Sequence, residues 1–98
     1  MNKTILITGA AKRIGKEIAL TYCDMGWNII IHYNSSKNDA EKLANEINSK
    51  NPESAKIIQA NLDISSDVQK LINESRDCFE SIDVTVPASR LYENHNFA

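Results

Sequence analysis

The chain has 98 residues, of which 42% are hydrophobic and 24% are charged, and its formal net charge is −2. This is the composition of an ordinary globular domain or of a piece of a larger one. The charge balance argues against nucleic acid as a partner, because it supplies no broad basic surface. The apolar runs are too short to span a membrane, so we expect a cytoplasmic protein without a membrane partner. The two cysteines, Cys23 and Cys78, lack metal-ligand spacing, and we expect reduced thiols and no metal site.

A short apolar run, a glycine turn and an amphipathic pattern follow one another between residues 4 and 25. Residues 5–7 predict a buried strand, and Gly9 and Gly15 bracket a tight turn. Apolar residues then recur at three- and four-residue spacing over residues 14–25, which predicts a helix with one apolar face.

A strand that enters a glycine turn and opens a helix suits a pyrophosphate group. The helix N-terminus offers unpaired N–H groups and about half a positive charge, and glycine lets the backbone approach the anion. Lys12 and Arg13 add cationic side chains to this turn. The alternative is a structural turn that binds no ligand.

The pattern continues as an alternation of strands and helices. Residues 28–33, 56–62 and 82–86 predict three more strands, and residues 38–50 and 65–79 predict two more helices. A β-α-β-α-β-α-β order with short loops implies right-handed crossovers, and therefore a parallel sheet with helices on both faces.

Several residues mark the expected ends of these elements. Gly26 is placed to stop the first helix, and Asn38 with Glu41 predicts a capping box for the second. Ser65 or Ser66 is expected to cap the third helix. Because proline cannot donate to a sheet ladder, we expect one domain over residues 1–86 and an irregular C-terminal tail over residues 87–98.

Four segments resemble the N-terminal part of short-chain dehydrogenases/reductases, over residues 1 to about 92. They are Thr8–Gly15 (TGAAKRIG), His32–Ser36 (HYNSS), Gln59–Leu62 (QANL) and Ile82–Val84 (IDV). The usual loop of the family has a glycine where Arg13 stands. The arginine form is typical of the pteridine reductase and dihydromonapterin reductase branch, to which the chain is most similar.

The resemblance implies a Rossmann-like parallel sheet of order 3-2-1-4, incomplete relative to the full family fold. It also implies an NADP-binding portion of an oxidoreductase that transfers a hydride from NADPH to a small carbonyl or pterin substrate. Gly9, Arg13, Ile14 and Gly15 would hold the cofactor phosphates, and Ala88 and Ser89 match the segment that lies beside the cofactor ribose.

Charge after the second predicted strand favours NADP over NAD. Folds that prefer NAD place Asp or Glu there for the ribose 2′-hydroxyl. This chain instead offers His32, Tyr33, Asn34, Ser35 and Ser36, which suit a 2′-phosphate. The alternatives are helix capping by the two serines and a core position for the histidine.

The adenine ring has three candidate neighbours after the third predicted strand. Family members usually carry Asp there, and the register puts Asn61 in that place, followed by Leu62 and Asp63. An amide both donates and accepts hydrogen bonds, so either Asn61 or Asp63 can serve.

Two departures from the family pattern bear on catalysis. The family follows strand four with two asparagines, whereas this chain reads Val86–Arg90 (VPASR), in which both asparagines are missing and only the Ala88–Arg90 portion fits the pteridine reductase form. The catalytic Ser, Tyr and Lys of the family are expected beyond position 98. Tyr33 and Lys37 match the Tyr-x-x-x-Lys spacing, but at a strand-to-loop junction, which indicates coincidence. The alternatives to a reductase portion are a non-catalytic nucleotide-binding module and a truncated product without function. The fourth strand would be an open edge, through which the chain could self-associate.

Overall fold

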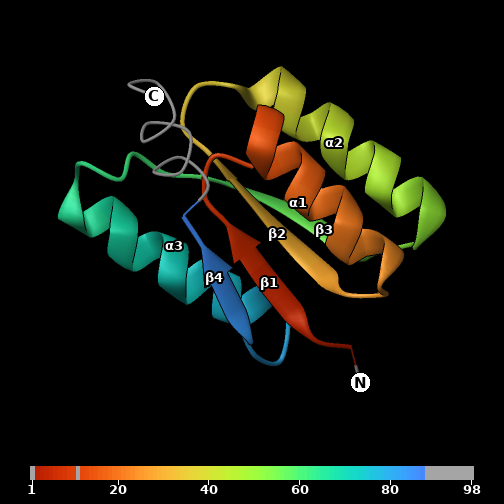
Figure 1. The fold of residues 1–98 in the computed structure, drawn as a ribbon. Helices are drawn as coiled ribbons and strands as arrows, with labels where there is room; N and C mark the ends of the chain where they lie inside the picture. Colours follow the sequence, from red (N-terminus) through yellow and green to blue (C-terminus); the bar gives the residue numbers. More distant parts are fainter. Residues whose placement is uncertain (1, 11, 88–98) are drawn as a thin grey trace.

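The computed structural model describes residues 2–10 and 12–87 (Figure 1). The elements, in chain order, are β1 (Thr4–Ile7), α1 (Arg13–Asp24), β2 (Asn28–Tyr33), α2 (Lys37–Lys50), β3 (Ala55–Gln59), α3 (Ser65–Cys78) and β4 (Val84–Val86). The strands form one sheet in the order β3-β2-β1-β4, and every neighbouring pair is parallel. The predicted α/β fold, its strand order and its helices on both faces are confirmed.

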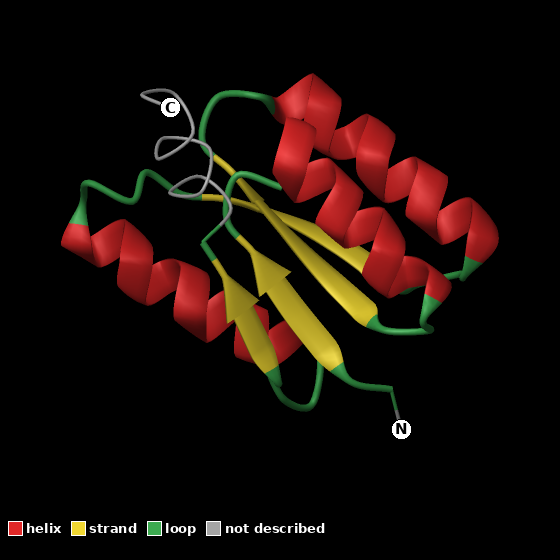
Figure 2. Cartoon of the chain, in the orientation of Figure 1, coloured by secondary structure: helices red, strands yellow, loops and turns green. Residues whose placement is uncertain are grey.

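One face of the sheet carries two helices. Ile5 and Ile7 of β1 and Ile29 and Ile31 of β2 are fully buried on this face, against apolar residues of α1 and α2. Figure 2 shows these two helices together on one side of the strands. Residues two apart in a strand share a face, so the alternation of β1 and β2 determines which isoleucines meet these helices.

The other face carries α3. Leu6, Ile30, Ile58 and Ala60 form a second buried cluster with Leu71 of α3. The consecutive isoleucines of β2 are therefore buried on both sides of the sheet, as expected for an inner parallel strand.

The end of α1 follows its prediction, with one exception. Gly26 has φ of +84°, its N–H donates to the Cys23 carbonyl, and the Trp27 N–H donates to the Tyr22 carbonyl. The Trp27 and Tyr22 rings then meet edge to face at 4.9 Å. Met25, predicted on the apolar face, is instead 61% exposed, because the helix ends before it.

The predicted helix caps are wrong at α2 and α3. Ser36 stands at the N-cap of α2, one residue before its first helical residue, so Asn38 lies inside the helix and no side chain caps it. Ile64 is the N-cap of α3, and neither Ser65 nor Ser66 provides a capping bond. At α3 the Asp67 carboxylate in the first turn accepts the Asn61 N–H at 2.8 Å instead.

Two strands are shorter than predicted. β3 ends at Gln59 because the Asn61 N–H bonds to Asp67, which turns the chain toward α3. β4 begins at Val84, although the Asp83 N–H still donates to the Thr4 carbonyl at 2.8 Å. β4 lies at the edge of the sheet, as expected, and self-association through this edge stays a prediction.

Candidate functional site

The loops that follow β1, β2 and β3 lie at one edge of the sheet, where the parallel strands end. Ile7 pairs with Ile31 and with Val86, and Tyr33 pairs with Gln59, so the strand ends lie in register (Figure 1). Ligands of open α/β sheets bind outside the carboxyl ends of the strands, and the predicted site residues from Gly9 to Asp63 gather at this edge.

The glycine turn is tight and depends on glycine at two positions. Gly9 has φ of +66°, which side-chain-bearing residues rarely adopt. Gly15 sits directly against the turn, because an added Cβ would lie 2.5 Å from the Gly9 carbonyl oxygen and 2.6 Å from the Ala10 Cα. Glycine at position 15 is therefore required for the start of α1 to pack on the turn.

The N-terminus of α1 is electropositive. Asp39 and Asp67 occupy the first turns of α2 and α3, whereas the first turn of α1 carries no acidic residue. Lys12 stands at its N-cap without a capping side-chain bond. Within the described part of the chain, the Ile14 N–H donates to no acceptor, while the Gly15 N–H donates to the Lys12 carbonyl. The helix dipole is thus left uncompensated at an end that offers an amide to an anion.

Arg13 begins α1 in a strained conformation. Its φ is +46°, in the left-handed region that favours glycine, and its side chain is exposed. Such a backbone costs about 1–2 kcal/mol for a residue with a Cβ. The strain falls at the position where the family's usual loop has glycine, which is here the first residue of α1.

His32 is buried and bridges two of the loops. The Gly9 N–H donates to its Nδ1 at 3.1 Å, and its Nε2 lies 2.8 Å from the Ala60 carbonyl oxygen. An accepting Nδ1 carries no hydrogen, so the ring is neutral and Nε2–H donates to Ala60. Burial lowers the pKa of His32, and the Ala60 bond acts in the opposite direction. Both ring nitrogens therefore contact the protein, and neither faces a ligand.

The loop after β2 exposes small polar groups. Asn34 and Ser35 are exposed, and Ser36 is half-buried at the N-cap of α2 without a side-chain capping bond. The Gln59 side chain donates to both the carbonyl and the side-chain oxygen of Asn34, which orders this loop against β3. Capping does not occupy the Ser36 hydroxyl, so the alternative interpretation of that serine is not supported.

Tyr33 belongs to the core beneath α1 and α2, where it is only 9% exposed. Lys37 is the first residue of α2. Their four-residue spacing therefore joins a core side chain to a helix start, which agrees with its interpretation as coincidence.

The loop after β3 presents an apolar surface beside polar groups. Leu62 and Ile64 are 38% and 47% exposed, which is high for large apolar side chains. The Asn61 side-chain oxygen accepts the Asp63 N–H at 3.0 Å, so the amide NH₂ of Asn61 and the Asp63 carboxylate are the groups that this loop offers outward.

Ala88 and Ser89 lie outside the described residues, as does the predicted tail beyond Pro87. The end of β4 nevertheless reaches the site, because the Thr8 N–H donates to the Val86 carbonyl at 3.0 Å. The chain therefore leaves β4 beside the glycine turn.

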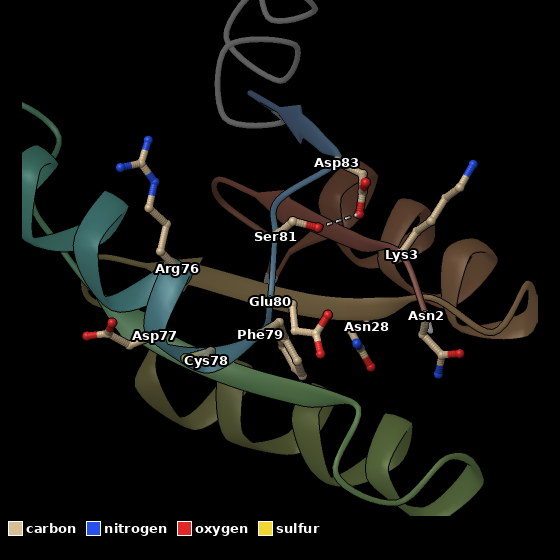
Figure 3. A pocket seen from close by; sticks show the side chains of 10 residues that line it. All are labelled: Asn2, Lys3, Asn28, Arg76, Asp77, Cys78, Phe79, Glu80, Ser81 and Asp83. Carbon is tan, nitrogen blue, oxygen red and sulfur yellow. Dashed lines mark hydrogen bonds between the residues drawn. The ribbon is translucent and has the colours of Figure 1, made fainter.

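A hollow of about 770 Å³ lies at the opposite edge of the sheet. Figure 3 shows the side chains that line it, among them Lys3, Asn28, Phe79 and Asp83. Lys3 and Asp83 precede strands, Asn28 is the first residue of β2, and Phe79 follows α3. The Asp83 carboxylate accepts the Thr4 N–H at 2.8 Å. This is the amino edge of the sheet, whereas ligands of open α/β sheets bind at the carboxyl edge, so the hollow is not the candidate site.

Sequence reasoning missed the bridge made by His32 and the strain at Arg13. The alternation of β2 does place His32 on the same face as Ile30, which signals burial, but its backbone partners are remote in sequence. The acid-free first turn of α1 was readable from the residues themselves.

Residues 2–10 and 12–87 contain neither a membrane-spanning helix nor a metal-binding cluster. No helix there is long and apolar enough to cross a membrane. No group of three or more His, Cys, Asp or Glu side chains in the same ranges could hold a metal ion.

The chain is similar to reductases over most of its length. The 3-oxoacyl-[acyl-carrier-protein] reductase FabG of Staphylococcus epidermidis is 42% identical over 86 residues, which cover 88% of this chain and 35% of that protein. The FabG of Staphylococcus aureus strain N315 is 40% identical over the same length. A short-chain type dehydrogenase/reductase of Picea abies is 33% identical over 89 residues, which cover 86% of this chain and 33% of the relative.

The chain thus spans about a third of the length of the curated relatives it matches. These relatives are named as 3-oxoacyl reductases or general family members, so they do not support the predicted pteridine reductase branch. The model of the family "short chain dehydrogenase" matches residues 3–97. The family and these relatives imply an NAD(P) cofactor. With its Rossmann-like sheet and glycine turn, the chain therefore belongs to the short-chain dehydrogenase family, as an N-terminal nucleotide-binding portion.

Proposed function

We propose that this chain binds NADPH at the carboxyl edge of its sheet, as the nucleotide-binding portion of a short-chain reductase. The observation that carries the proposal is the N-terminus of α1, which combines an acid-free first turn, an Ile14 N–H without a described acceptor and a glycine turn that a Cβ would fill. The pyrophosphate would lie over Gly9, Ile14 and Gly15, with the Arg13 guanidinium beside it.

The 2′-phosphate of the adenosine would lie between Arg13 and the loop after β2. Asn34, Ser35 and Ser36 supply amide and hydroxyl groups there, and Lys37 adds a cation at the start of α2. No carboxylate occurs in this loop before Asp39, so nothing in it would repel the phosphate or hold a free 2′-hydroxyl as NAD-preferring sites do. NADP is therefore favoured over NAD.

The adenine ring would lie against the loop after β3. The exposed side chain of Leu62 offers an apolar surface to one face of the ring. Asp63 would accept a hydrogen bond from the adenine amino group, and the Asn61 NH₂ would donate to a ring nitrogen. Tyr33 and His32 would support this site from beneath, since both are buried.

When bound, the reduced nicotinamide supplies a hydride to an electrophilic carbon. We propose a small carbonyl compound as the substrate class, because the relatives named above include 3-oxoacyl reductases. A pterin is the second candidate, and its support is the Arg13 form of the glycine loop with the Ala88–Arg90 segment. In either case this chain's own residues bind and orient the nucleotide.

The test is a calorimetric titration of the chain with NADPH and, in parallel, with NADH. We expect NADPH to bind more tightly, with the preference shrinking as salt is raised, because a phosphate contact is screened. Equal affinities would remove the 2′-phosphate site from the proposal, and binding of neither nucleotide would refute it.

A further inference from the structure

His32 contacts the glycine turn twice. Its ring Nδ1 accepts the Gly9 N–H at 3.1 Å, and its backbone carbonyl accepts the next N–H, that of Ala10, at 3.3 Å. Two successive amides of the turn are thus held by one residue of β2. Gly9 and Ala10 are also the residues against which Gly15 packs, so the same contact supports the start of α1.

The other side of the ring reaches the loop after β3. Nε2–H donates to the Ala60 carbonyl at 2.8 Å, and the Ala60 N–H donates to the Tyr33 carbonyl at 3.0 Å. The following residue, Asn61, is in turn bonded through its N–H to Asp67 of α3. The ring therefore lies between the turn proposed to hold the phosphates and the loop proposed to hold the adenine.

Because His32 is buried, leaving either ring nitrogen without a hydrogen-bond partner would destabilise the fold. His32 is only 4% exposed, and a buried polar group without a partner loses its hydrogen bonds to water without gaining one to the protein. No titratable side chain occurs at residues 7–10, where β1 ends and the glycine turn begins, or at residues 58–60, where β3 ends. Backbone groups alone therefore satisfy the ring, which requires the neutral form with its hydrogen on Nε2.

We propose that His32 is a positioning residue for the nucleotide site, which orients the Gly9–Ala10 turn through Nδ1 and ties it to the Ala60 carbonyl through Nε2. This inference rests on the proposed function for its ligand, but the bridge itself can be tested without one. His32 touches no nucleotide in this account. It acts by holding the glycine turn in the form that leaves the Ile14 N–H accessible to phosphate.

Two substitutions separate the halves of the bridge. In the His32→Asn variant the side-chain oxygen stands as many bonds from Cβ as Nδ1 does, so it can still accept the Gly9 N–H, but it cannot reach Ala60. In the His32→Gln variant the side-chain nitrogen stands where Nε2 does and can still donate to Ala60, but the acceptor for Gly9 is lost.

The experiment measures NADPH affinity and thermal unfolding for the unaltered chain and both variants. We expect both variants to unfold at lower temperature, whereas the affinity stays within about twofold for His32→Asn and falls about tenfold for His32→Gln, the effect of one lost hydrogen bond on the turn. Equal affinities in the two variants would overturn the proposal, whether both match the unaltered chain or both fall.

A second measurement distinguishes failure of this proposal from failure of the proposed function. Nitrogen-15 NMR of the nucleotide-free chain reports which ring nitrogen carries the hydrogen and how fast the Gly9 N–H exchanges. We expect the hydrogen on Nε2 and a Gly9 amide that is protected in the unaltered chain and in His32→Asn, but not in His32→Gln. A hydrogen on Nδ1, or an unprotected Gly9 amide, would overturn the bridge. If the bridge is present and NADPH does not bind, the proposed function fails instead.

Discussion

The left-handed backbone at Arg13 leads to a prediction in which stability and binding change in opposite directions. Arg13→Gly removes a Cβ from a residue at φ of +46°, which relieves about 1–2 kcal/mol of strain. Glycine also increases the conformational entropy of the unfolded chain, which destabilises the fold by about 0.5–1 kcal/mol and offsets part of the relieved strain. Relative to a variant that keeps the Cβ at this position, the net expectation is a stabilisation of about 0.5–1 kcal/mol, which raises the midpoint of thermal unfolding by about 2–8 °C in a domain of this size.

The matched control is Arg13→Ala. Both variants lose every contact of the arginine side chain, but alanine keeps the Cβ and with it the strained backbone. The difference in unfolding free energy between the two variants therefore isolates the backbone term. In both variants we expect the affinity for NADPH to fall by about 1.5–3 kcal/mol, the contribution of a charge-assisted bond to a phosphate.

Urea unfolding and NADPH titration of the same three proteins provide the assay. The reasoning about strain is refuted if Arg13→Gly is less stable than Arg13→Ala, which is the order expected at an ordinary helical position. The reasoning about the guanidinium is refuted if neither substitution changes NADPH affinity.

Three further predictions concern the turn, the cofactor preference and the buried histidine. Gly15→Ala should lower stability by about 1–3 kcal/mol and weaken nucleotide binding, because its Cβ would meet backbone atoms at 2.5 and 2.6 Å. Gly26→Ala is the control: its φ of +84° is strained for alanine, but nothing lies within 4 Å of the added Cβ, so it should lower stability alone. Ser36→Asp should keep or raise stability, since Asp is a favourable N-cap, and should weaken NADPH binding more than NADH binding; an unchanged ratio in titrations would exclude this loop from the 2′-phosphate site. Burial lowers the pKa of His32 in the folded chain, so between the folded and unfolded pKa values the unfolded chain binds more protons. The contribution of His32 to stability is therefore complete above about pH 6.5 and is lost as pH falls through the folded pKa. The loss is at most about 1.4 kcal/mol per pH unit. Urea unfolding of the unaltered chain and of His32→Asn at pH 7.5 and 5 should show the larger acid loss in the unaltered chain, and equal losses would contradict this.

The order of helices and strands could be predicted because the spacing of apolar residues along the sequence is enough to indicate it. The three isoleucines of β2 and the apolar stripe of α2 (Leu43, Ala44 and Ile47) are buried as their spacing requires. Right-handed parallel crossovers then leave few arrangements, and the resemblance to the family supplied the strand order.

Helix starts were predicted less well, because capping residues compete with other acceptors. Ser65 has the residue type of an N-cap, yet it lies inside α3, and the Asp67 carboxylate receives an N–H from upstream of the helix instead. Residue type therefore indicated the region of each start but not the residue that provides the bond.

The bridging role of His32 could not be predicted from the sequence, for a different reason. Burial and cofactor contact were both open, and its actual partners are backbone groups 23 and 28 residues away, which no side-chain pattern marks. The reductase branch was inferred from Arg13 and the Ala88–Arg90 segment, whereas the similarity to FabG extends over 86 residues. A few loop positions are weaker evidence for a branch of the family than similarity over the whole βα framework.

The most direct test of the account is to map the NADPH contacts on the amides of the chain by nitrogen-15 NMR titration. We expect the largest shifts at Ile14 and Gly15 and in the loops at residues 34–36 and 61–63, all at the carboxyl edge of the sheet. Shifts that gather instead around Lys3, Cys78 and Ser81, beside the hollow at the amino edge, would contradict it.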